Sequence, residues 1–336
     1  MSSIRIANDA HWHELRKQNV GASESPALFG LLPWKTHWNL WMEKAGKLDA
    51  PDLDGVKHIS AGKHFEPAVA GWASQKFGIT LNKVRRYLID DVCPRMGASL
   101  DYEQVGTGER IPTELKWVIR ADDRWEYDGD VIVAAPDYYL VQIQHQLACA
   151  GAERGQLIAF INGDVRRAVY ERRDGVIKAL RERITEFWAD IEADKEPAID
   201  FKADAEAVMR YASKVGHHTI EWTPRIASLA NAAFKAAQLR SEMEEEADAA
   251  KAELDHAMIE AATMAGMNDP EAQVKVEGDG FRITSTHVAP YPGREVTQDM
   301  VGTRIGARGA FRKVTVSRPK PKTSKKAKDT QPQEQA

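Results

Sequence analysis

The chain has 336 residues, of which 43% are hydrophobic and 29% are charged, proportions typical of a soluble globular protein. No apolar run approaches the roughly 20 residues that a membrane span needs, and the first residues lack the basic and apolar segments of a secretory signal. The only cysteines, Cys93 and Cys149, stand far apart in sequence. They argue against a disulfide framework and a cysteine zinc site, and they favour a reducing, cytoplasmic environment.

Charge is unevenly distributed along the chain, although the net charge is only −4. Residues 304–328 contain ten Lys or Arg and no acidic residue, whereas residues 225–263 contain eight acidic and four basic residues. We expect the basic stretch either to add sequence-independent phosphate contacts or to serve as a solubilising tail.

Short helices with clear boundaries are expected in the N-terminal segment. Asp9 is placed to cap a helix that runs to about Asn19, and Ser23 is placed to open a second helix. Thr36 is expected to cap a third helix, which Gly46 ends.

The next segments predict one longer helix and then a sheet. An apolar stripe indicates a helix over residues 60–77. Three runs, 84–89, 95–102 and 111–118, have the composition of strands in one central sheet. A helix is then expected over 136–151.

The second half of the core begins with a hairpin signal. Asn162-Gly163 predicts a tight turn between strands at 156–161 and 166–170. An amphipathic helix follows over 174–193. This succession of helices and strands favours an α/β core that ends near residue 200.

Beyond the core, residues 225–263 have the composition of a long helix, such as a coiled-coil arm. Residues 273–287 alternate like a hairpin, and the segment from about residue 318 has the composition of a disordered tail. The predicted division is therefore a core domain, an arm with a small β unit, and a tail, with the bounds 1–200, 201–317 and 318–336.

Two carboxylates and a lysine on neighbouring predicted strands are the most informative pattern in the chain. Asp101 ends one strand, and Glu114 and Lys116 follow on the next. Residues two apart on a strand face the same side, so Leu115 faces the core and leaves its carbonyl free to coordinate. Paired carboxylates suit Mg²⁺, and a neighbouring ammonium can orient a water or stabilise a phosphate. An ordinary surface salt bridge gives the same Glu-x-Lys pattern.

Other polar residues can join this group. Glu66, on the helix before the sheet, would complete a one- or two-metal site if it points toward the other carboxylates. Gln142 and Gln144 lie on the helix that follows the sheet, and their amides can bind a phosphate or a water. A solvated glutamate and a polar helix face are the alternative interpretations.

Arg16 and Ser23 form a second candidate site. A helix N-terminus opened by Ser23 would offer free N–H groups to a phosphate, and Arg16 would add a bidentate partner. These groups suit a terminal 5′-phosphate. The alternative is a capping serine beside a solvated arginine.

Together these residues resemble the YqaJ-type viral recombinases, which are related to phage lambda exonuclease within the PD-(D/E)xK nucleases. The resemblance covers roughly residues 10–195 and depends on the order and spacing of short motifs. One departure is Leu100, at a position where the family often has a proline. The motifs are Arg16, 21–24 (GASE), 28–35 (LFGLLPWK), Leu40-Trp41, Lys44, Gly62, Glu66, 98–101 (ASLD), 114–116 (ELK) and 142–146 (QIQHQ).

The resemblance implies a PD-(D/E)xK nuclease core, in which helices flank a central mixed sheet, followed here by the helical arm and small β unit. It implies a metal-dependent exonuclease, with Mg²⁺ or alternatively Mn²⁺, that resects linear double-stranded DNA from 5′ ends and releases 5′-mononucleotides. The implied roles are metal ligation by Glu66, Asp101, Glu114 and the Leu115 carbonyl, catalysis by Lys116, Gln142 and Gln144, 5′-phosphate binding by Arg16 and Ser23, and a supporting role for Asp91.

Partners follow from the same resemblance. Relatives assemble as ring-shaped trimers around DNA and leave a 3′ single strand for an annealing protein, which implies phage-type recombination in a bacterial cytoplasm. Two other functions stay open, namely an endonuclease of the same superfamily and a non-catalytic scaffold that binds DNA ends. A Cas4-like enzyme is disfavoured because its iron–sulfur cluster needs several cysteines.

Overall fold

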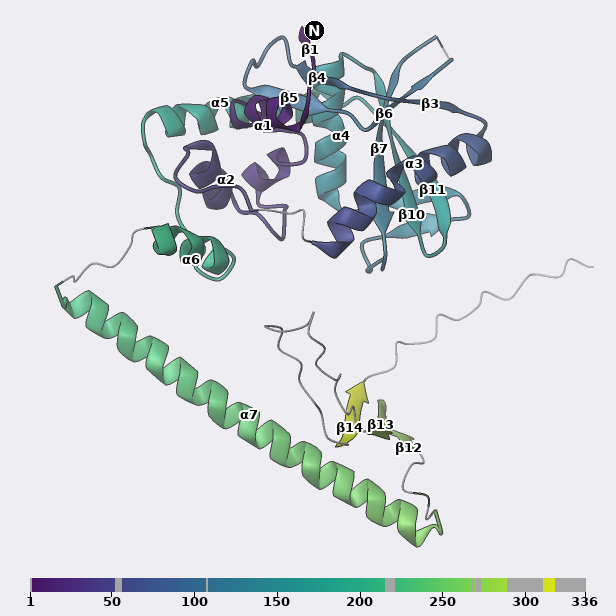
Figure 1. Cartoon of the computed structure of the whole chain (residues 1–336), viewed down its shortest axis with the longest axis vertical. Helices are drawn as coiled ribbons and strands as arrows, with labels where there is room; N and C mark the ends of the chain where they lie inside the picture. Colours follow the sequence, from purple (N-terminus) through teal and green to yellow (C-terminus); the bar gives the residue numbers. More distant parts are fainter. Residues whose placement is uncertain are drawn as a thin grey trace, which may run out of the picture. The chain divides into compact units, whose positions relative to one another are not determined.

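The computed structural model divides into two compact units, Met1–His218 and Thr219–Ala336, and each is described by itself (Figure 1). The predicted tail and most of the basic stretch lie outside the described residues. The residues that the structure describes are 2–51, 56–106, 108–214, 221–267, 269, 273–288 and 311–317.

A small sheet occupies one side of unit 1. Its strands follow the order β1 (Ser2–Arg5), β4 (Arg86–Ile89), β5 (Met96–Ser99) and β2 (Val20–Gly21). β4 and β5 are antiparallel, whereas β2 runs parallel to β5. This parallel pairing places Gly21 directly opposite Gly97.

A larger, mixed sheet forms the centre of unit 1. Its strands follow the order β3 (Thr80–Lys83), β6 (Tyr102–Val105), β7 (Ile111–Val118), β10 (Arg154–Ile161), β11 (Asp164–Glu171), β9 (Val131–Ala134) and β8 (Glu126–Asp128). β7 runs parallel to β10 and antiparallel to β6. β10 and β11 form the predicted hairpin, and Asn162 and Gly163 take the positive φ angles, 50° and 85°, that its turn requires.

Helices pack on both sheets of unit 1, with the bounds α1 (Asp9–Lys17), α2 (His37–Lys44), α3 (Lys57–Phe77), α4 (Asp137–Ala150), α5 (Asp174–Glu192) and α6 (Ala205–Lys214). Thr36 caps α2 as predicted, because its side chain accepts a hydrogen bond from the Asn39 N–H at 3.0 Å. The cap of α1 is Asn8 instead of Asp9. The second predicted helix is only a short 3₁₀ turn, η1 (Ser25–Phe29).

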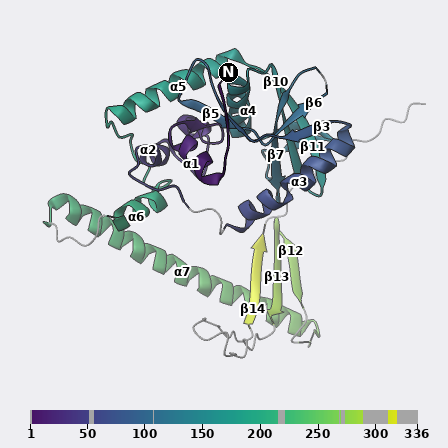
Figure 2. The ribbon, with the colours of Figure 1, turned by 45° about the horizontal axis from the view of Figure 1, so that its top comes forward.

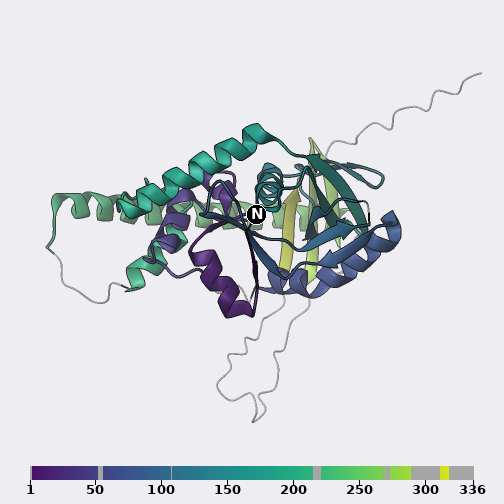
Figure 3. The ribbon, with the colours of Figure 1, turned by 90° about the horizontal axis from the view of Figure 1, so that it is seen from above.

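α3 and α4 cover opposite faces of the larger sheet (Figure 3). Along β10, Leu157 and Ala159 pack in the cluster that contains α4 residues, while Ile158 packs in the cluster that contains α3 residues. This is the two-residue alternation of a strand buried on both faces. Glu114 pairs with Leu157 across the sheet and therefore faces α4.

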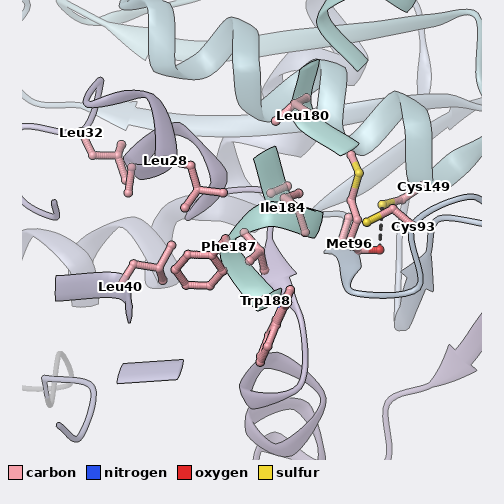
Figure 4. Close-up of a cluster of buried hydrophobic side chains, with 14 of the residues drawn as sticks. Leu28, Leu32, Leu40, Cys93, Met96, Cys149, Leu180, Ile184, Phe187 and Trp188 are labelled. Atoms are coloured by element: carbon pink, nitrogen blue, oxygen red, sulfur yellow. Dashed lines mark hydrogen bonds between the residues drawn. The ribbon is translucent and has the colours of Figure 1, made fainter. Parts of the chain in front are cut away.

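The largest hydrophobic cluster lies where the small sheet meets α2, α5 and η1. Leu40, Met96 and Phe187 are at most 1% exposed there (Figure 4). Both cysteines are free and buried, and the Cys149 thiol donates to the Met96 carbonyl at 3.6 Å. Because α4 packs against strands of both sheets, it joins the two halves of the core.

The structure corrects the prediction of a single central sheet. The strand predicted at 95–102 is β5 of the small sheet, which ends at Ser99, and its last residue, Tyr102, already begins β6 of the larger sheet. The strand predicted at 84–89 also lies in the small sheet. An apolar run does not reveal a change of sheet, because strands in both sheets are buried. Five of the described strands of unit 1 were not predicted, since each has only two to four residues: β1, β2, β3, β8 and β9.

Unit 1 extends beyond the expected boundary at residue 200 because α6 packs on the core. The Thr36 hydroxyl donates to Asp204 Oδ1 at 2.5 Å, just before α6 begins. Ala207 of α6 is 2% exposed and belongs to the largest cluster.

Unit 2 contains the predicted long helix and β unit (Figure 2). Helix α7 (Pro224–Met264) has one buried side chain, Met258, among its described residues. An antiparallel sheet follows, with the order β12 (Val274–Gly278), β13 (Phe281–Val288) and β14 (Phe311–Ser317), of which the third strand was not predicted. The predicted α/β class, a mixed sheet flanked by helices with an arm and a β unit, is confirmed. Among the described residues, no helix combines the length and hydropathy of a membrane crossing.

Candidate active site

Asp101 lies where the chain passes from the small sheet to the larger one, between β5 and β6. Its Oδ2 accepts a hydrogen bond from the Leu115 N–H of β7 at 3.0 Å. This bond fixes Asp101 beside the strand that carries Glu114 and Lys116, fourteen residues later in the chain. The two carboxylates and the lysine of the sequence motif therefore meet in space.

The ionic state of this group is unusual. Burial, and then the charge of Glu114, raise the pKa of Asp101 to about 7. Lys116 Nζ lies 2.5 Å from Glu114 Oε1 and 5.2 Å from the centre of the Tyr139 ring. Burial lowers the pKa of Lys116, but its interactions with Glu114, Tyr139 and Asp101 together outweigh this effect and raise the pKa above its ordinary value. Two carboxylates thus share one ammonium.

Helix α4 uses its polar residues in different ways. Gln142 is 7% exposed and lines a pocket at this group. Gln146, one turn later, donates to Glu114 Oε2 at 2.6 Å. Gln144 does not line the pocket, contrary to expectation. Its amide instead donates to the Glu171 carbonyl at 2.8 Å and accepts from the Arg173 N–H at 2.7 Å.

Glu66 also departs from the expected arrangement. Its carboxylate forms an ion pair with Lys83 of β3, and Glu66 does not line the pocket. Within the described residues, no group of three or more His, Cys, Asp or Glu side chains is arranged to hold a metal ion. Glu66 is nevertheless near enough for its charge to contribute to the raised pKa of Asp101, and metal ligation by all three carboxylates stays a prediction.

Arg16 belongs to a buried charge cluster. Its Nη2 lies 2.8 Å from Glu24 Oε1, and Lys44 Nζ lies 2.8 Å from Glu24 Oε2. Burial alone would raise the pKa of Glu24, but Arg16 and then Lys44 hold it well below its ordinary value. The guanidinium also lies 4.7 Å over the Trp12 ring. Arg16 is therefore fixed in position and is not a solvated side chain.

Glycine makes room for this cluster. A Cβ atom on Gly21 would lie 3.0 Å from Glu24 Oε2, and the Gly21 N–H donates to that oxygen at 2.9 Å. Ser23 is exposed in the turn that follows and lines the pocket. Contrary to the prediction, Ser23 does not open a helix, because η1 begins only at Ser25. Ser23 therefore contributes its side chain and not a helix N-terminus.

One pocket of about 210 Å³ brings these two groups together. We call Asp101, Glu114 and Lys116 its carboxylate side, and Arg16 with its partners Glu24 and Lys44 its arginine side. The lining residues are Trp12, Arg16, Gly21, Ala22, Ser23, Tyr87, Ser99, Asp101, Glu114, Lys116 and Gln142.

Several residues of the site were not predicted. Glu24 and Lys44 belong to the sequence motifs, but they are twenty residues apart and nothing in the sequence indicates that they form an ion pair. Tyr87 gives no signal, because it occupies an ordinary strand position. Asp91 is exposed and does not line the pocket, whereas its neighbour Asp90 is 2% exposed and pairs with Arg181 Nη2 at 2.7 Å.

Comparisons with known proteins agree with the sequence motifs. Residues 11–153 match the family model of the YqaJ-like viral recombinase domain. The uncharacterized protein YqaJ of Bacillus subtilis (strain 168) is 27% identical over 221 residues, which are 63% of this chain. The match spans 66% of that protein, just under two thirds of its length.

The chain is also similar to solved structures. An alkaline exonuclease from Laribacter hongkongensis is 16% identical, with a TM-score of 0.42 over 62% of this chain and 100% of the exonuclease. A phage related exonuclease from Haemophilus somnus 129PT is 11% identical, with a TM-score of 0.41 over 52% of this chain and 96% of that protein.

Proposed function

The chain carries a YqaJ-like viral recombinase domain over residues 11–153, and from this premise we propose that it is a DNA exonuclease. It removes nucleotides from the 5′ ends of linear double-stranded DNA and leaves a 3′ single strand for annealing in phage-type recombination. One observation carries the proposal: a carboxylate pair with a lysine and an arginine with a serine line the same pocket.

The carboxylate side suits a hard divalent cation. Asp101 and Glu114 offer the oxygen ligands that Mg²⁺ and Mn²⁺ prefer. Burial and the neighbouring Glu114 charge raise the pKa of Asp101 to about 7, and a bound cation removes that mutual repulsion. Asp101 and Glu114 would therefore hold the metal ion, which when bound polarises the phosphate and lowers the pKa of a coordinated water.

The remaining residues bind and orient the substrate in this proposal. Arg16 and Ser23 hold the terminal 5′-phosphate, and the next phosphodiester then lies at the carboxylate side. The Lys116 ammonium donates to the attacking water or to the phosphate, and Gln142 donates to a phosphate oxygen. Water forms the new P–O bond and gives up a proton to the solvent, while the P–O3′ bond breaks and O3′ takes up a proton, so that one 5′-mononucleotide leaves.

The products explain why both sides share one pocket. Cleavage releases the first nucleotide with its 5′-phosphate and leaves a new 5′-phosphate on the shortened strand. That new end is the same ligand that the arginine side bound before, so the cycle can repeat. A trimeric ring around the DNA and a single-strand annealing partner stay predictions from the family resemblance.

The test is digestion of a linear duplex labelled at either end, with a 5′-phosphate or a 5′-hydroxyl, in Mg²⁺ and in EDTA. We expect label at the 5′ end to be released first, faster from phosphorylated ends, and only with the metal. A closed circular duplex should resist. Nicking of the circle would favour an endonuclease, and binding of ends without cleavage would favour a non-catalytic scaffold.

A further inference from the structure

Tyr87 of β4 carries a buried hydroxyl that lines the pocket without a partner. The residue is 1% exposed. Within the described part of the chain, its hydroxyl oxygen has no hydrogen-bond partner. An unpaired buried hydroxyl lowers the stability of the folded protein, and most buried polar side chains avoid this cost. The exception lies in the same pocket as Arg16 and Ser23.

The position of this hydroxyl is fixed by the small sheet. A Cβ atom on Gly97 would lie 2.5 Å from both the hydroxyl oxygen and Cε1 of Tyr87. The hydroxyl-bearing edge of the ring thus occupies the space that a side chain at residue 97 would fill. Tyr87 also pairs with Ser99 in the sheet, and the Ser99 hydroxyl accepts from the Trp12 indole N–H at 3.3 Å. The ring therefore has little freedom to turn its hydroxyl elsewhere.

Two glycines that face each other create this arrangement. Gly21 and Gly97 are partners in the β2–β5 pairing. Gly21 admits the Glu24 carboxylate and Gly97 admits the Tyr87 ring. The guanidinium that Glu24 holds and the phenol that Gly97 admits consequently reach the same pocket.

The chemistry of these groups selects an anion. The arginine side contains two cationic groups, Arg16 and Lys44, and one carboxylate, Glu24, so it keeps an excess of positive charge. Burial raises the pKa of Tyr87 above its ordinary value, and the hydroxyl stays protonated as a donor. A guanidinium and two hydroxyl donors suit the three oxygens of a phosphate monoester.

We propose that the Tyr87 hydroxyl is a third member of the end-binding site, which donates a hydrogen bond to the terminal phosphate that Arg16 and Ser23 also bind. Tyr87 is then a specificity-determining residue that distinguishes a 5′-phosphate from a 5′-hydroxyl. This inference rests on the proposed function, because it takes the ligand to be a DNA end.

The experiment measures end preference in binding, separately from cleavage. The full chain is titrated in EDTA against a short blunt duplex with either a 5′-phosphate or a 5′-hydroxyl, by fluorescence anisotropy. We expect the wild-type protein to prefer the phosphorylated duplex. Tyr87→Phe keeps the packing on Gly97 and should reduce that preference about tenfold or more, because hydrogen bonds to charged groups are strong.

Stability provides the second measurement. Because the hydroxyl has no protein partner, Tyr87→Phe should melt at the same temperature as the wild type or higher. Tyr127→Phe is the matched control. Tyr127 lies on β8, and its hydroxyl accepts a hydrogen bond from Asn162 Nδ2 at 3.0 Å. The substitution removes this hydroxyl and should leave the end preference unchanged.

The outcomes separate this inference from the proposed function. An unchanged preference in Tyr87→Phe, or no preference in the wild type, overturns the role of Tyr87. A lowered melting temperature with an unchanged preference shows that the hydroxyl serves the fold. A wild type that prefers phosphorylated ends, loses this preference in Tyr87→Phe and never cleaves DNA supports Tyr87 and overturns the nuclease.

Discussion

The two sides of the pocket are built from opposite principles. The carboxylate side places two acids against one ammonium, on a strand of the larger sheet and the residue that leads into it. The arginine side places two cations around one acid, and its parts come from α1, the turn after β2 and α2. One side is complete within sixteen residues of sequence, whereas the other combines segments that contribute one charged residue each.

This difference separates two tasks. Charges that repel each other, as Asp101 and Glu114 do, are useful only where a cation or a change of protonation relieves them. Charges that are fully paired, as Glu24 is, hold a side chain in place for a ligand that arrives already charged. We therefore expect variants of the carboxylate side to lose chemistry on every substrate, and variants of the arginine side to lose discrimination between ends.

The largest effect should come from Lys116→Ala. We expect the cleavage rate to fall about a hundred- to ten-thousandfold, because a positioned ammonium is lost from the reacting centre. The loss should be equal for 5′-phosphorylated and 5′-hydroxyl duplexes. Steady-state digestion of both duplexes measures it, and binding in EDTA should persist. Appreciable hydrolysis by this variant would remove Lys116 from the mechanism.

His145 provides a test of how the two sides are held together. From α4, its Nε2 lies 3.0 Å from the carbonyl of Gly97, while Nδ1 has no partner within the described residues. Burial lowers the pKa of His145 to about 4. The folded protein thus keeps the imidazole neutral, whereas the unfolded chain takes up a proton below pH about 6.5.

The resulting stability is complete above pH about 6.5 and falls as the pH decreases toward 4, by about 3 kcal/mol. His145→Gln keeps a donor for the Gly97 carbonyl and should flatten this part of the stability curve. Urea unfolding of both proteins at several pH values measures the difference, so that other titrating groups cancel. Parallel curves for the two proteins would mean that His145 does not carry the acid sensitivity.

The sequence predicted what depends on local spacing. Glu114 and Lys116 face the same side because strand residues alternate, and this alternation can be read from the chain. The cap at Thr36 and the turn at Asn162-Gly163 were predicted for the same reason, since each depends on a few neighbouring residues.

What the sequence did not reveal depends on distant partners. Nothing in the sequence around Gly97 indicates that a tyrosine ring packs against it. Likewise, nothing around Gly21 indicates that this residue pairs with Gly97 on the neighbouring strand. Gln142 and Gln144 are both plausible active-site amides by composition, yet Gln144 bonds the backbone at the end of β11 and just after it. Glu66 was expected to join the other carboxylates, but Lys83 of a strand that was not predicted pairs with it.

Arg16→Gln should produce a smaller and more selective effect than Lys116→Ala. We expect kcat/KM for phosphorylated ends to fall about ten- to a hundredfold, because a charge-assisted bidentate contact is lost. Hydroxyl ends should be little affected. Arg5→Gln, on the exposed strand β1, is the control. Equal losses on both kinds of end would show that the arginine side acts in the chemistry, and the comparison of the two sides would fail.

The smallest effects should distinguish two glutamines of one helix. Gln146→Leu removes the donor to Glu114 Oε2, and the carboxylate, held then only by Lys116, is less well positioned. The kcat value should therefore fall about tenfold with unchanged end preference. Gln144→Leu should instead lower the free energy of unfolding by about 1–2 kcal/mol, because the Glu171 carbonyl and the Arg173 N–H lose their partner. Its kcat should stay at the wild-type value. The reverse result would be a slow Gln144→Leu enzyme and an unstable Gln146→Leu protein. It would support the sequence-based prediction that Gln144 acts in catalysis, and it would mean that Gln146 does not position the Glu114 carboxylate.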